Sequence, residues 1–315
     1  MRLIEHIAPR SVVLDYAPAA QLAALLLGVP AYQITNGFDS PPPTCPVYGL
    51  TVRGPYLDRI NTQKTAAIAS AIAQVSQRLG GPKQLTLEQF LTYPQKIYDC
   101  IPETDPYGPR SDGLIVGPMS GLAKSDVAQP SPWDLHPSTQ QGQRVFAYLR
   151  NLQSATSLVQ ALNKFNGNVL CVWPDAPLQW VEQIHNKRLH IQRKPVDLHR
   201  ALVGADVVVS YGGVTTACHA LLAAKPQLLV PSDIEKTLLS RRIAALGAGL
   251  VWHEKSSRIT AIEALKMTLE NDNLTNTAQR LASQYSQPLL LQNKAAFIRS
   301  VTGRSESLQT INSNI

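Results

Sequence analysis

The sequence predicts an α/β protein with two doubly wound, Rossmann-like domains. Short apolar segments alternate with helix-forming segments along most of the 315 residues, as the strands and crossover helices of parallel sheets do. The alternation is interrupted in 124–143, where prolines and polar residues predict an interdomain linker. A chain of this length also favours two domains over one.

The N-terminal part, 1–123, predicts about three strands, each a short apolar run bounded by turn-forming residues. Its clearest helix, 18–27, is rich in Ala and Leu and stops at Gly28. A doubly wound domain needs about five strands, with roughly 30 residues for each βαβ unit, so we expect this domain to be incomplete. Strands are predicted at 11–15, 31–35 and 113–116, and helices at 2–8, 18–27 and 57–79.

The C-terminal part, 144–287, repeats the alternation with better rhythm and predicts a complete domain. Residues 288–315 form a tail with a helix at 290–301 and a polar end from Gly303. Strands are predicted at 144–149, 168–172, 189–192, 206–209, 227–230 and 250–252. Helices are predicted at 155–165, 178–185, 198–202, 215–224, 234–246, 258–270 and 275–285.

The composition excludes several classes of protein. With 44% apolar residues the chain is not intrinsically disordered, and its charge of 29 − 22 = +7 contains no block typical of a nucleic-acid tail. No apolar run is long enough to span a bilayer and no signal peptide is visible, which favours a cytoplasmic location with peripheral membrane contact at most. The cysteines have no metal or disulfide spacing and predict buried or free thiols. They are Cys45, Cys100, Cys171 and Cys218.

The most informative segment is 205–231. An apolar strand leads into Gly212-Gly213, and a helix begins directly afterwards with Thr215 and Thr216 in its first turn. Glycine lets a ligand approach the backbone closely, and a helix N-terminus offers N–H groups and a positive dipole end. The segment therefore predicts a phosphate site; the alternative is an ordinary turn between a strand and a helix.

In its context this segment resembles the donor-binding motif of GT-B glycosyltransferases of the UDP-glycosyltransferase type, which include bacterial macrolide- and rhamnosyltransferase-like members. The shared features are the Gly pair, the Thr pair, Ala220-Leu221, Pro226, Pro231 and Arg241-Arg242-Ile-Ala-Ala-Leu-Gly-Ala-Gly249. Weaker similarity covers 12–38, 144–149 and 194–198. The resemblance implies a GT-B fold truncated at the N-terminus, a UDP- or dTDP-linked sugar donor, a small-molecule or lipid acceptor, and no metal or other cofactor.

The resemblance also implies roles for individual residues. Gly212, Gly213, Thr215 and Thr216 would hold the donor diphosphate, whose developing charge such contacts stabilise. Tyr211 stands where the family has a histidine, and it keeps one hydrogen-bond donor without an imidazolium charge.

Four further residues fall at positions that contact the donor in the family. Arg193 would stack on the nucleobase, or it is simply solvated. His219 aligns with the glutamate that contacts the ribose, or it is a structural residue of its helix. Glu235 and Lys236 align with the Asp-Gln pair that binds the sugar, or they form a solvated first turn.

Catalysis in this family inverts the anomeric centre. A histidine deprotonates the acceptor hydroxyl and an aspartate orients it; Asp15 aligns with that aspartate, and the histidine would lie upstream of residue 1. Asp15 is alternatively an N-cap for helix 18–27. The implied activity is metal-independent sugar transfer to a hydroxyl. The alternatives are a nucleotide-sugar-binding remnant without its catalytic base and, less favoured, a GT-B-fold epimerase.

Overall fold

The computed structural model describes residues 1–42, 55–119, 131–134, 142–150, 154–178, 184 and 186–302. The chain forms two compact units, one of Met1–Gly117 with the segment from Leu291, the other of Pro118–Leu290. Several predicted features lie wholly or mostly outside the described residues: Cys45, the linker 124–143, the helix 178–185 and the polar end from Gly303. The domain boundary in that linker therefore stays a prediction.

The first unit contains a parallel sheet in the order β1-β2-β3-β4. Three of the four strands match the prediction. The expected number of three strands was wrong because β3 was not predicted. This strand begins with polar Gln95 and Lys96, and Lys96 is buried in the fold with its Nζ 2.7 Å from Asp112 Oδ2. The strands are β1 Val12–Asp15, β2 Ala31–Thr35, β3 Gln95–Tyr98 and β4 Gly113–Ile115.

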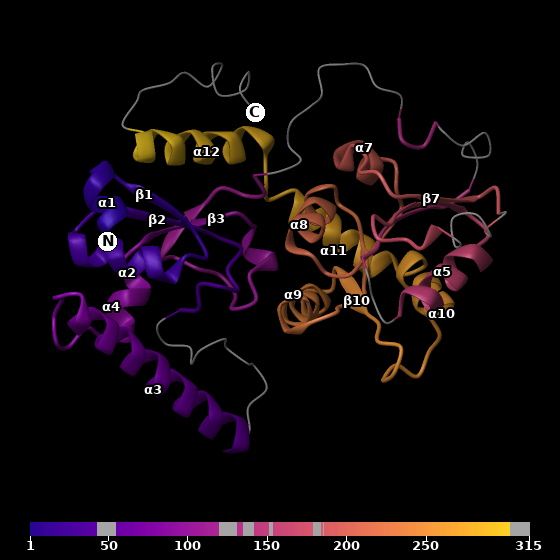
Figure 1. Cartoon of the computed structure of the whole chain (residues 1–315). Helices are drawn as coiled ribbons and strands as arrows, with labels where there is room; N and C mark the ends of the chain where they lie inside the picture. Colours follow the sequence, from indigo (N-terminus) through magenta and orange to yellow (C-terminus); the bar gives the residue numbers. More distant parts are fainter. Residues whose placement is uncertain are drawn as a thin grey trace. The chain divides into compact units, whose positions relative to one another are not determined.

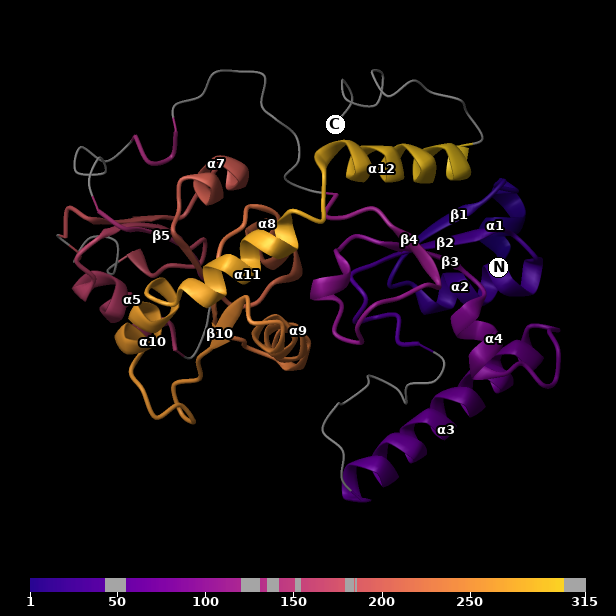
Figure 2. The ribbon, with the colours of Figure 1, turned by 180° about the vertical axis from the view of Figure 1, so that it is seen from behind.

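Helices cover both faces of this sheet, with α12 on one face and α2 on the other (Figures 1 and 2). On α12, the Phe297 ring lies 6.3 Å from the Tyr32 ring, whose hydroxyl donates to the Ser300 carbonyl at 3.0 Å. Helix α2 ends at Gly28, whose φ of 66° requires the predicted glycine. The helices are α1 Arg2–Ile7, α2 Pro18–Leu27, α3 Pro55–Arg78, α4 Leu87–Thr92, the 3-10 turn Pro102–Thr104, and α12 Gln287–Thr302.

The second unit contains a six-stranded parallel sheet in the order β10-β9-β8-β5-β6-β7. All six predicted strands are confirmed, with bounds that differ by one residue at most. The chain moves outward from β5 through β6 to β7 and then returns to β8 on the other side of β5. The strands are β5 Arg144–Tyr148, β6 Asn168–Val172, β7 Leu189–Gln192, β8 Val207–Ser210, β9 Gln227–Leu229 and β10 Gly249–Val251.

Both faces of this sheet are buried, which explains its nearly continuous apolar strands. In β5, Val145 packs in the core beneath α5 and α10, while Phe146 packs in the opposite core with Leu202 of α7 and Ala220 of α8. Helix α11 packs against α8 (Figure 1). The helices are α5 Ala155–Lys164, α7 Leu198–Val203, α8 Val214–Leu222, α9 Ile234–Ala245, α10 Ala261–Leu269 and α11 Asp272–Ala282.

Two expectations from composition are tested by these elements. Cys100, Cys171 and Cys218 are buried and form no disulfide, as predicted. Burial raises the pKa of the Cys171 thiol to about 12. Within the part of the chain that the structure describes, no helix combines the length and the apolar character needed to cross a bilayer.

Candidate functional site

A pocket of about 450 Å³ lies at the carboxyl edge of the second sheet. There Tyr148, at the end of β5, pairs with Ser210, at the end of β8. From β5 the chain continues to β6 toward one edge of the sheet, and from β8 it continues to β9 toward the other edge. Doubly wound sheets bind ligands outside the strand ends at such a point, where the strand order reverses. Six predicted residues line the pocket together: Tyr211, Gly213, Thr215, Thr216, Glu235 and Lys236.

The loop from β8 to α8 has a backbone that only glycine fits. Gly212 has a φ of 80°, and a Cβ there would lie 2.6 Å from Ser240 Oγ on α9. Gly213 is the N-cap of α8 and has no side chain with which to accept from the first turn. The predicted helix start is thus confirmed, and the first N–H groups of α8 belong to residues at the pocket.

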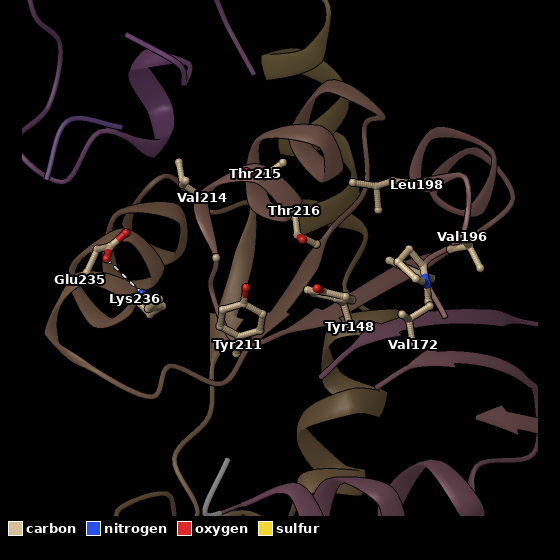
Figure 3. A pocket seen from close by; sticks show the side chains of 13 residues that line it. Tyr148, Val172, Val196, Leu198, Tyr211, Val214, Thr215, Thr216, Glu235 and Lys236 are labelled. Carbon is tan, nitrogen blue, oxygen red and sulfur yellow. Dashed lines mark hydrogen bonds and ion pairs between the residues drawn. The ribbon is translucent and has the colours of Figure 1, made fainter. Parts of the chain in front are cut away.

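Two tyrosine rings lie beside this loop. The centroids of Tyr148 and Tyr211 are 5.8 Å apart, and the Tyr211 hydroxyl lies 2.8 Å from where a Cβ on Gly213 would stand. Burial and the neighbouring Tyr148 raise the pKa of Tyr211, although the charges of Arg150 and Lys236 oppose the shift. Tyr211 is therefore a neutral donor. Figure 3 shows the hydroxyls of Tyr148, Tyr211 and Thr216 turned toward the same space.

Opposite the apolar side chains, the first turn of α9 carries charges. Asp233 caps this helix by accepting from the Lys236 N–H at 3.1 Å, and the Lys236 ammonium lies 3.0 Å from Glu235 and 3.3 Å from Asp233. Partial burial opposes the charged form of Lys236, but the hydrogen bond to Glu235 and both carboxylate charges outweigh it and raise the pKa. Glu235 and Lys236 are thus partly buried at the pocket rather than fully solvated.

Four predicted residues do not line this pocket. Gly212 lies beneath the loop against Ser240, and His219 is buried within α8. Arg193 is exposed, and its Nε donates to the Pro174 carbonyl at 3.1 Å. Asp15 lies in the first unit, exposed at the end of β1. Its alternative role was wrong, because the N-cap of α2 is Ala17 and no side chain caps that helix.

Sequence reasoning missed the apolar wall of the pocket. Phe146, Tyr148 and Val172 lie on strands, where periodicity does not distinguish a core face from a pocket wall. The other three members lie in 194–198, which the family resemblance includes without a ligand contact for any of them. The available signal was position, since Tyr148 and Val172 are the last residues of β5 and β6. The wall consists of Phe146, Tyr148, Val172, Pro195, Val196 and Leu198.

The segment that builds this pocket matches a known domain family. Residues 156–290 match the sequence model for the C-terminal domain of erythromycin biosynthesis protein CIII-like proteins. This segment is therefore similar to the EryCIII-like C-terminal domain. The matched region contains α8, α9 and the Gly212-Gly213 loop, so the predicted donor motif lies inside it. A comparison with curated protein sequences finds no match.

Solved structures extend the likeness beyond residues 156–290. Spinosyn forosaminyltransferase SpnP matches with a TM-score of 0.61 and 17% identity over 89% of this chain and 72% of its own. Glycosyltransferase SnogD from Streptomyces nogalater has a TM-score of 0.58 and 18% identity, over 90% of this chain and 70% of its own. The calicheamicin glycosyltransferase CalG4 has a TM-score of 0.64 and 15% identity, over 94% of this chain and 76% of its own. The chain therefore has the GT-B fold of these glycosyltransferase structures.

Proposed function

We propose that this chain transfers a sugar from a nucleoside-diphosphate sugar to a hydroxyl group of a small-molecule or lipid acceptor, with inversion and without a metal ion. One observation carries the proposal: the glycine turn at the β5–β8 switch point opens into a pocket that Thr215, Thr216 and the start of α8 line. A UDP- or dTDP-linked donor fits this chemistry. Support for the latter comes from SpnG, a structural neighbour solved in complex with thymidine diphosphate (TM-score 0.59, 20% identity).

The pocket offers a different environment for each part of such a donor. The apolar side, with Val172, Val196 and Leu198, suits the nucleoside (Figure 3). The helix start with Thr216 suits the diphosphate, and Glu235 offers carboxylate oxygens to sugar hydroxyls. Arg193 and His219 do not line the pocket, so their proposed contacts with nucleobase and ribose would require a donor that extends past its described walls.

In the chemical step the acceptor oxygen forms a bond to the anomeric carbon while the bond between that carbon and the diphosphate oxygen breaks. As that bond lengthens, negative charge builds on the leaving diphosphate, and fixed N–H groups and hydroxyls stabilise the charge without reorganising. In this proposal they do what a metal ion does elsewhere, so turnover should persist in EDTA. The acceptor proton would go to the histidine that the family resemblance implies, which aligns with no residue of this sequence and which Asp15 would orient. An Asp15→Asn variant should then lower turnover and leave donor affinity unchanged.

The first experiment is calorimetric titration of UDP and dTDP into the wild-type protein and two variants. Gly213→Asp places a carboxylate at the proposed phosphate site, and Gly213→Asn places a neutral group of the same size there. Both side chains meet the Tyr211 hydroxyl, so their difference isolates the charge. We expect the Asp variant to bind at least tenfold more weakly than the Asn variant; equal affinities would place the phosphates elsewhere.

A second candidate is a protein that binds the donor without catalysis. It is favoured by the fact that every residue of the described pocket belongs to the second unit. Incubation with donor sugars and a panel of hydroxylated aglycones distinguishes the two. A glycoside product supports transfer, binding without product supports the second candidate, and a changed sugar in donor incubated alone supports an epimerase.

A further inference from the structure

Arg150 lies two residues beyond Tyr148, directly after β5 at the switch point of the second sheet. It is absent from the donor motif and lies 62 residues before Gly212, so no sequence pattern assigns it a role. Its side chain is 48% exposed, and the nearby Tyr148 and Asp175 raise the pKa of its guanidinium. Tyr148 is the last residue of β5 and lines the pocket, so the guanidinium lies beside a wall of the pocket.

An ion pair holds the guanidinium in place. Arg150 Nε lies 2.9 Å from Asp175 Oδ2, which follows the end of the neighbouring strand β6. Asp175 is 39% exposed, and an ion pair this exposed to water contributes little energy and exchanges readily. The ion pair therefore orients Arg150 and still leaves its guanidinium able to bind a second anion. The guanidinium has further N–H donors, arranged in a planar fork, for that purpose.

The charge balance of the pocket indicates that one cation is insufficient. Among the described residues that line it, Lys236 carries the only formal positive charge, and Asp233 and Glu235 both lie within 3.3 Å of its ammonium. That cluster has a net charge of −1. The start of α8 supplies roughly half a positive charge, whereas the diphosphate of a sugar donor carries two negative charges and its leaving form carries more.

We propose that Arg150 is a cationic contact for the donor's diphosphate, facing it from the β5 side while the start of α8 faces it from the β8 side. The inference rests on the proposed function and adds a residue outside the donor motif to the same site. The guanidinium takes the electrostatic role that Tyr211, being neutral, cannot fill. A phosphate group would displace or share the Asp175 contact and accept two N–H bonds from the fork.

The test compares dTDP with thymidine, titrated by calorimetry into the wild-type protein and its Arg150→Gln variant. We expect Arg150→Gln to weaken dTDP about tenfold, as the loss of a charge-assisted contact would, and to leave thymidine unchanged. The difference should shrink with added salt because the site is open to water. Arg280→Gln is the matched control, since Arg280 is exposed on α11 and does not line the pocket.

Asp175→Asn separates binding from a structural role. If Arg150 only tied β5 to β6, Arg150→Gln and Asp175→Asn would weaken dTDP alike, and that result would overturn the inference. We expect Asp175→Asn to leave dTDP affinity unchanged or higher, because it frees the guanidinium. Arg150→Lys, which keeps the charge without the fork, should bind with intermediate affinity. Unchanged dTDP binding by Arg150→Gln overturns this inference alone; a wild-type protein that binds no nucleoside diphosphate overturns it together with the proposed function.

Discussion

The glycine at position 212 offers the sharpest test of how the loop is built. Alanine there would have to adopt a φ of 80°, which costs an L-residue about 1 kcal/mol. Its Cβ would also lie 2.6 Å from Ser240 Oγ, an overlap that costs roughly 1–3 kcal/mol when packed atoms must move. We therefore expect Gly212→Ala to lower the free energy of unfolding by about 2–4 kcal/mol and to weaken dTDP binding.

Ser240→Ala supplies the control. The Ser240 hydroxyl is fully buried and has no hydrogen-bond partner among the described residues, so its removal should change stability by less than about 0.5 kcal/mol. In that background the closest contact of the new Cβ disappears, and the next atom is the Lys236 carbonyl oxygen at 3.2 Å. The cost of Gly212→Ala should then fall to about 1–1.5 kcal/mol, a coupling of about 1–2 kcal/mol between two contacting sites.

Urea unfolding followed by tryptophan fluorescence measures these values. All four tryptophans lie between Trp133 and Trp252, so the signal reports on the second unit alone. A Gly212→Ala cost that is the same in the wild-type protein and in the Ser240→Ala background would refute the steric argument. A cost below about 0.5 kcal/mol would refute the requirement for positive φ as well.

Three further predictions concern other parts of the molecule. Thr216→Val should weaken dTDP about fivefold through loss of one hydrogen bond, whereas Thr216→Ser should bind normally in the same titration. Cys171 should resist thiol reagents at pH 8 in the folded protein, since burial raises its pKa to about 12, and react after unfolding; modification of the native protein would contradict its burial. Asp112→Asn should destabilise the first unit by roughly 2–3 kcal/mol by leaving Lys96 buried without its carboxylate, as amide exchange in β3 would show. Burial opposes ionisation of Asp112, but contacts from Arg110, Lys96 and Tyr98 lower its pKa; its contribution is therefore present above the ordinary value of 3.8 and lost as the pH falls below it.

The second sheet was predicted well because its strands are short apolar segments, so their burial can be read from their own residues. β6 and β7 match their predicted bounds; the apolar residues of β6 face both layers of helices, and those of β7 face one. The first sheet was predicted less well for the opposite reason. β3 carries Lys96 in a buried position, and local periodicity treats such a residue as exposed. That burial is tolerable because the carboxylate of Asp112, sixteen residues along the chain, accepts from the Lys96 ammonium.

Local sequence was enough to find the motif: the glycine pair after a strand, the threonines in the following helix turn, and the resemblance these carry. Those are local features, fixed by backbone geometry over a few residues. Which side chains share the pocket depends on the tertiary structure. It brings Tyr148, at the end of β5, and Arg150, just after it, near the Gly212-Gly213 loop, and it leaves Arg193 and His219 outside the described lining. The reason is the strand order. In a parallel sheet, neighbouring strands end at the same edge even when crossover segments separate them widely in the sequence.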